Sequence, residues 1–176
     1  MKQLRNTVIR AGLDALYFTG AHHVLRPILA GVGTIFMLHH VRPARDDPFQ
    51  PNRHLEITPG FLREVLAHVR ALGVDLVSMD EAHRRMQERD FARRFACFTF
   101  DDGYRDNRDH ALPVMREQNA PFTVYVASDF AEGNGRLWWV ALERVIAKAG
   151  MIEITRDGAV EQLDASNAAA KQTAFN

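Results

Sequence analysis

The sequence has one cysteine, no net charge and no long apolar run, and each of these absences excludes a class of protein. Cys97 has no second cysteine to pair with, so the fold cannot depend on an intramolecular disulfide. Twenty-two basic residues balance twenty-two acidic residues, which argues against a nucleic-acid partner. No run approaches the ~18 apolar residues of a membrane-spanning helix, and the N-terminus lacks the uninterrupted apolar core of a secretory signal. We therefore expect a cytoplasmic protein without an integral membrane segment.

The chain is long enough for one domain, and its 47% hydrophobic content is typical of a globular protein. Residues 1–32 form an N-terminal extension that we expect to be helical, because Leu4, Val8 and Leu13 recur at roughly helical spacing. Its apolar face could cover a core or lie on a membrane surface. The polar face lacks a dense row of Lys and Arg, which favours the core.

Strands and helices alternate along the central part of the chain. Thr58-Pro59 and Ser78 are typical of helix starts, and the first apolar run resembles a strand that is buried on both faces of a sheet. The alternation predicts βα units and a mainly parallel sheet. We expect strands over 34–41, 74–77, 95–100 and 121–127, helices over 59–72, 79–89 and 111–118, and a long surface loop over 42–57.

The C-terminal part has a different pattern. We expect a helix over 138–149 and a hairpin over 151–163, because Asp157-Gly158 is a favourable hairpin turn. The last residues, 164–176, are small and polar, with no strand pattern and no helix cap, and we interpret them as a tail at a truncation end.

The segment Phe98 to Asn107 is the strongest candidate for chemistry. An apolar strand leads there into Asp101, Asp102 and Gly103. Side chains alternate along an extended backbone, so one carboxylate could bind a metal while the other handles a proton. An ordinary Asp-Asp-Gly turn remains an alternative. His39 and His40 also follow a predicted strand, and sites of parallel folds gather at the carboxyl ends of strands.

Five separated segments together carry a resemblance to a known family. The segments are Leu38-His39-His40-Val41, Phe98-Thr99-Phe100-Asp101-Asp102-Gly103-Tyr104, Ala111-Leu112-Pro113, Pro121-Phe122-Thr123-Val124-Tyr125-Val126 and Leu137-Trp138-Trp139. In this order they resemble the NodB-like polysaccharide deacetylases of the chitooligosaccharide type. The resemblance implies a deformed (β/α) barrel of the α/β class, of which residues 33–163 are the N-terminal part, so that the barrel is incomplete in this chain. An incomplete sheet would leave an unpaired edge and an exposed apolar face.

The resemblance also implies an activity, namely metal-dependent hydrolysis of the N-acetyl groups of poly- or oligosaccharides that contain N-acetylglucosamine. It makes Asp101 the general base and Asp102 a ligand of a divalent metal, usually zinc. It gives His39 a supporting role in substrate binding. Tyr104 follows the aspartates, so it could line the cleft and bind substrate or face solvent after the glycine turn. The family completes its metal site with a His-Ser/Thr-x-x-His segment, which this sequence lacks, so the zinc site is incomplete in this chain.

Two other classes of function remain open. The chain could be a catalytically inactive truncated remnant, or a carbohydrate-binding module that keeps the first half of the fold. A phosphoryl-accepting receiver domain is a weaker alternative, because the first strand ends in His39-His40 rather than in an acidic cluster. Trp138-Trp139 could stack on a sugar or belong to the core. The sequence does not indicate an oligomeric state.

Overall fold

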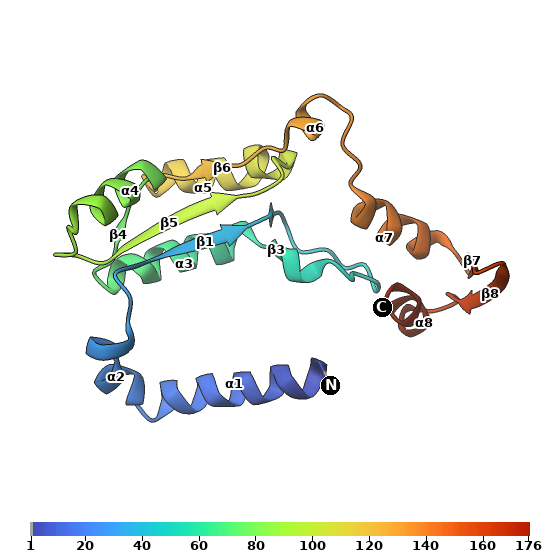
Figure 1. Ribbon diagram of the computed structural model, residues 1–176, viewed down its shortest axis with the longest axis horizontal. Helices are drawn as coiled ribbons and strands as arrows, with labels where there is room; N and C mark the ends of the chain where they lie inside the picture. Colours follow the sequence, from blue (N-terminus) through green and yellow to red (C-terminus); the bar gives the residue numbers. More distant parts are fainter. Residues whose placement is uncertain (1) are drawn as a thin grey trace. The chain divides into compact units, whose positions relative to one another are not determined.

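The computed structural model describes residues 2–176, so Met1, the first residue of the predicted extension, lies outside it. The chain divides into two compact units, residues 1–34 and residues 35–176. The first unit contains helices α1 (Lys2–Phe18) and α2 (Ala21–Leu29), which confirms the predicted helical character of the extension (Figure 1).

The second unit is built on a four-stranded sheet. β5 (Phe95–Phe100) lies between β1 (Gly33–Leu38) and β4 (Asp75–Leu76), and β6 (Thr123–Val124) also pairs with β5. β4 pairs in parallel with the first two residues of β5, and β6 pairs in parallel with its last two. β1 and β5 run in the same direction (Figure 1), so their carboxyl ends meet at one edge. The predicted parallel arrangement is therefore confirmed.

Three helices follow the predicted pattern: α3 (Pro59–Ala71), α4 (Met79–Glu88) and α5 (Leu112–Glu117). The Thr58 hydroxyl accepts a hydrogen bond from the first turn of α3, and the Ser78 hydroxyl does the same for α4, both at 3.1 Å. Each hydroxyl satisfies an amide that has no partner within its helix. Both predicted caps are confirmed.

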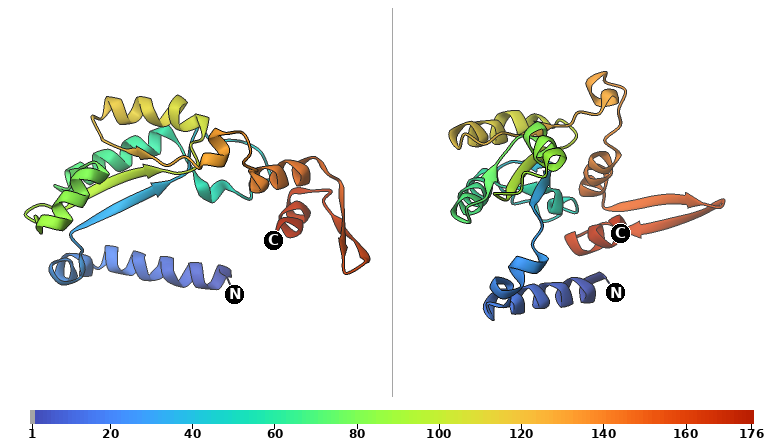
Figure 2. Two further views of the ribbon diagram at one scale, coloured as in Figure 1. Left: turned by 45° about the horizontal axis from the view of Figure 1, so that its top comes forward. Right: turned by 60° about the vertical axis from the view of Figure 1, so that its left-hand side comes forward.

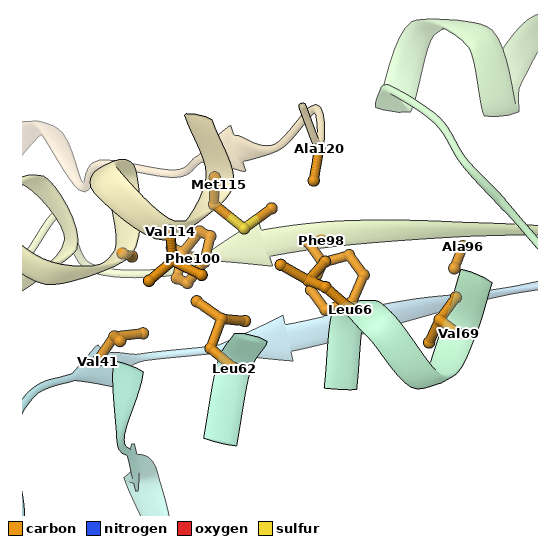
Figure 3. Close-up of a cluster of buried hydrophobic side chains, with 11 residues drawn as sticks. Val41, Leu62, Leu66, Val69, Ala96, Phe98, Phe100, Val114, Met115 and Ala120 are labelled. Atoms are coloured by element: carbon orange, nitrogen blue, oxygen red, sulfur yellow. The ribbon is translucent and has the colours of Figure 1, made fainter. Parts of the chain in front are cut away.

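The core lies between β5 and the helices α3 and α5. All six residues of β5 are buried, and Figure 3 shows side chains of both helices converging on Phe98 and Phe100. Cys97 is buried in the same strand, as predicted, and burial raises the pKa of its thiol. The other core members are Val41, Leu62, Leu66, Val69, Ala96, Ala111, Val114, Met115 and Ala120.

The prediction of a strand buried on both faces over 34–41 is wrong for β1. Phe36 and Leu38 pack against the core, but Ile35 and Met37 are 53% and 63% exposed. The alternation shows that residues 35–176 cover one face of β1 and not the other. The apolar run also divides after Leu38, and its end forms the short strand β2 (His40–Val41).

The strands of the described residues form this sheet and two separate pairs, and a closed barrel is not seen among them. β2 pairs in parallel with β3 (Glu56–Ile57), which follows the 3-10 helix η1 (Arg53–Leu55). The loop over 42–57 was predicted to be a surface excursion, and this is only partly right. Phe49 and Asn52 are 6% and 9% exposed, because the loop packs against the C-terminal part of the unit.

The remaining elements are α6 (Ser128–Ala131), α7 (Trp138–Lys148), β7 (Met151–Arg156), β8 (Ala159–Asp164) and α8 (Ala168–Phe175). β7 and β8 form the predicted antiparallel hairpin, visible in both views of Figure 2. The prediction that the tail lacks a helix cap is wrong. The Asn167 side chain accepts a hydrogen bond from Ala170 N at 3.0 Å, and the alanines that follow are strong helix formers.

Candidate active site

The turn after β5 sets the directions of the two aspartates. Asp101 N donates a hydrogen bond to Leu38 O at 2.8 Å, which joins the ends of β5 and β1. Asp102 and Gly103 follow in the left-handed region, with φ of 67° and 63°. A Cβ at Gly103 would lie 2.9 Å from Val126 Cγ2, so the turn requires glycine for both its conformation and its space. The predicted turn is confirmed.

Two clefts meet at these aspartates. The larger has a volume of about 790 Å³ and is lined by Asp102 together with His40, Tyr104 and Asp106. The smaller, of about 560 Å³, is lined by Asp101 and Asp102 beside apolar residues of the uncovered sheet face. Asp102 therefore borders both clefts, whereas Asp101 borders the smaller one. The two carboxylates therefore have different surroundings, but the turn causes this and not the alternation of an extended strand, because Asp102 lies in the left-handed region.

His40 is held by a carboxylate that sequence reasoning missed. Its Nδ1 lies 2.6 Å from Asp106 Oδ2, and both side chains are largely buried. Asp106 Oδ1 also accepts a weaker hydrogen bond from Val41 N at 3.4 Å. In the neutral imidazole, a proton on Nδ1 that is donated to Asp106 leaves Nε2 as an acceptor. The only sequence signal was the position of Asp106 within the segment from Phe98 to Asn107.

Tyr104 lies between His40 and α7. Its ring stacks on His40 with a centroid distance of 3.7 Å, and its hydroxyl accepts a hydrogen bond from Trp139 Nε1 at 3.0 Å. Burial raises the pKa of Tyr104 to about 12, and the negative charges of Asp102 and Asp106 add to this effect against the opposing hydrogen bond from Trp139. The hydroxyl is therefore protonated at neutral pH and can donate a hydrogen bond.

An ion-pair network forms another wall of the larger cleft. Arg45 pairs with Glu143 of α7 at 3.0 Å and with Glu56 of β3 at 2.8 Å. Arg42 also pairs with Glu56. Burial opposes ionisation of Glu56, but the hydrogen bonds from Arg42 and Arg45 outweigh it, so the pKa of Glu56 is lowered. The network fixes the loop over 42–57 against α7.

The other candidate residues differ in whether they line the two clefts. His39 is half-buried and lines neither cleft, so its role in substrate binding stays a prediction. His110 lies in the π-helix η2 (Asn107–Ala111) and lines the larger cleft. Trp138 is 66% exposed, whereas the indole of Trp139 is engaged with Tyr104.

The described residues do not fit a zinc ion. Among residues 2–176, no group of three or more His, Cys, Asp or Glu side chains is arranged to hold a metal. A catalytic zinc takes three protein ligands and a water molecule, and Asp102 supplies one carboxylate. The role of Asp102 as a metal ligand therefore stays a prediction that no geometry in this part of the chain tests.

Comparisons with known proteins bear on this site. Residues 88–161, which include both aspartates, match a family model described as polysaccharide deacetylase. No curated protein sequence matches the chain. The solved structure of the Streptococcus pyogenes deacetylase PplD in complex with acetate is similar, with a TM-score of 0.51 and 22% identity, over 58% of this chain and 45% of that one.

A de-N-acetylase from Aggregatibacter actinomycetemcomitans gives a TM-score of 0.48 and 14% identity, over 76% of this chain and 45% of that one. The chain thus spans less than half of each of these two structures. The match to the polysaccharide deacetylase family is therefore confined to residues 88–161, and the likeness to the Streptococcus pyogenes deacetylase is one of fold.

Proposed function

We propose that the protein hydrolyses the N-acetyl groups of N-acetylglucosamine-containing poly- or oligosaccharides. One observation carries the proposal. Asp101 and Asp102 belong to the segment that matches the deacetylase family, and they lie at the carboxyl end of the central strand where two clefts meet. Sites of parallel α/β folds occupy this position. Because the two carboxylates have different surroundings, one can accept a proton while the other takes a different role in the reaction.

Asp101 is assigned the role of general base. A carboxylate within reach of a water molecule removes its proton as the oxygen attacks the acetamide carbonyl, and the C–N bond then breaks as this proton passes to the leaving amine. Asp101 borders an open cleft whose walls are mostly apolar. Asp102, on the border of both clefts, is assigned as a metal ligand, and zinc stays a prediction from the resemblance because the described residues offer it one carboxylate.

Tyr104 is assigned to the substrate. It lines the larger cleft, and its protonated hydroxyl can donate a hydrogen bond to an acceptor oxygen of a sugar. The ring is fixed by its stacking on His40, so the hydroxyl is positioned before the substrate arrives. The deformed barrel and a cytoplasmic location, like the substrate role of His39, remain predictions from the sequence.

Release of acetate from a chitin oligosaccharide tests the function. We expect the wild-type chain, assayed with added zinc, to release acetate, and Asp101→Asn to lower the rate by about 10²-fold or more, because general base catalysis contributes at least that factor. Asp129→Asn is the matched control, because Asp129 is exposed and lines neither cleft.

A wild-type chain that releases no acetate would contradict the proposed activity for this chain. Calorimetric titration with the same oligosaccharide then separates the alternatives that the sequence left open. Binding that weakens in Tyr104→Phe would identify a carbohydrate-binding module, and the absence of binding would identify an inactive remnant.

A further inference from the structure

The N-terminal unit, residues 1–34, exposes many of its apolar side chains. Eight of them, from both helices, are each more than 60% exposed. Ile9, Leu13 and Leu16 recur at helical spacing along one side of α1, and Val24 and Ile28 do so on α2. We call these five exposed residues the docking surface. Within their own unit these helices provide no core that would bury these side chains. Exposed apolar residues that share one side of a helix are typical of a surface that binds a protein or a membrane.

The turn between the two helices holds them together. The Thr19 hydroxyl donates to Ala15 O at 2.6 Å, and His22 Nδ1 lies 3.0 Å from Leu16 O. The rings of Tyr17 and His22 stack with an interplanar angle of 7°. These contacts connect the end of α1 to the start of α2, so the apolar residues of both helices belong to one structural unit.

Charge is distributed unevenly between the two units. Residues 1–34 contain four basic residues and one acidic residue, a net charge of +3, whereas the remaining residues contain eighteen basic and twenty-one acidic residues, a net charge of −3. The overall neutrality therefore hides a basic N-terminal unit. A second copy of the chain would place +3 against +3 at the docking surface, which disfavours self-association.

We propose that residues 1–34 bind peripherally to an anionic phospholipid bilayer through the docking surface. The apolar side chains enter the interface between headgroups and acyl chains, and the net positive charge of the unit attracts it to the phosphates. Tyr17 and Phe18 add aromatic rings at the end of α1, and aromatic side chains are favoured at this depth. No helix of the described residues is long and apolar enough to cross a membrane, so the helices lie along the surface.

The sequence pattern alone favoured a core-covering role for α1. Within residues 1–34, α1 and α2 do not bury these side chains against each other, because Leu13 and Ile28 are 61% and 81% exposed. Apolar area supplies most of the binding, and the net charge of +3 adds attraction to anionic lipids. The proposal does not depend on the deacetylase function, since it concerns a different unit of the chain.

Vesicle sedimentation tests the proposal. The 176-residue chain is mixed with vesicles of phosphatidylcholine alone or of phosphatidylcholine with phosphatidylglycerol. We expect binding to the anionic vesicles that falls as salt is added, because salt screens the attraction between surface charges. Leu13→Glu and Ile28→Glu should each lower the partition coefficient roughly tenfold or more, since each removes a buried apolar side chain from the interface.

Val160→Glu is the matched control, because Val160 is equally exposed, at 60%, but belongs to the second unit. It should leave vesicle binding unchanged. Circular dichroism confirms that each variant keeps its helices. The proposal would be overturned if the chain did not bind anionic vesicles, or if it bound neutral and anionic vesicles equally and Leu13→Glu did not weaken this binding. It would also be overturned if sedimentation equilibrium showed a dimer that Leu13→Glu dissociates.

Discussion

His40 Nδ1 and Asp106 Oδ2 lie 2.6 Å apart in a largely buried pair that joins β2 to the segment preceding η2. We expect Asp106→Ala to lower the free energy of unfolding by about 1 to 3 kcal/mol, because it leaves the buried His40 without its partner. Urea unfolding measures the change.

Asp109→Ala is the control for that pair. Asp109 pairs with Arg108 at 2.7 Å, but both side chains are largely exposed, and exposed ion pairs contribute at most about 1 kcal/mol. A loss of stability in Asp109→Ala as large as that in Asp106→Ala would contradict the structural importance of the His40 pair.

The hydrogen bond from Trp139 to Tyr104 makes a second prediction. Trp139→Phe and Tyr104→Phe should each destabilise the protein, and the double variant should cost less than the sum of the two, with a coupling energy of about 0.5 to 1.5 kcal/mol. Thermal or urea unfolding of the four proteins gives this value. Trp138→Phe is the control, because Trp138 is 66% exposed. Strict additivity would show that the hydrogen bond does not stabilise the fold.

Gly103→Ala should destabilise the turn beside the aspartates. The residue has a positive φ, and the added Cβ would approach Val126 Cγ2 to 2.9 Å. We expect a loss of more than about 1 kcal/mol in the free energy of unfolding. Gly133→Ala separates the two causes, because Gly133 has a φ of +79° and a Cβ added there would meet no atom within 4 Å. If both variants lose the same free energy of unfolding, the contact between the added Cβ and Val126 does not contribute to the loss.

The ion pairs of Glu56 predict a dependence of stability on pH. The pKa of Glu56 is lowered from 4.5 in the folded protein, so its contribution to stability is present above pH 4.5 and is lost as the pH falls through the lower folded pKa. Urea midpoints of Glu56→Gln should therefore fall less steeply with acid than those of the wild type.

Glu153→Gln provides the comparison for this experiment, since Glu153 is exposed on β7. It should follow the wild-type pH dependence. If Glu56→Gln also follows the wild type, the pairs with Arg42 and Arg45 do not stabilise the folded state.

Local sequence alone determined the central strand and the turn after it. β5 is apolar at every position but Thr99, and Asp102-Gly103 has the residue types that a left-handed turn selects, so these features depend on nothing distant. The caps Thr58 and Ser78 were equally predictable, because a helix cap is a contact between residues three positions apart. The positions of Asp101 and Asp102 followed from the same local rules.

Tertiary structure decided which other residues join the aspartates. Two histidines, His39 and His40, follow β1 in succession, and the contact with Asp106, sixty-six residues away, selects His40 for the cleft while His39 lies outside it. The exposure of Met37 was also beyond the sequence, because an apolar run is the same whether helices cover one face of its strand or both. Residue patterns define what each element can bury, and only the packing of distant elements defines what is buried.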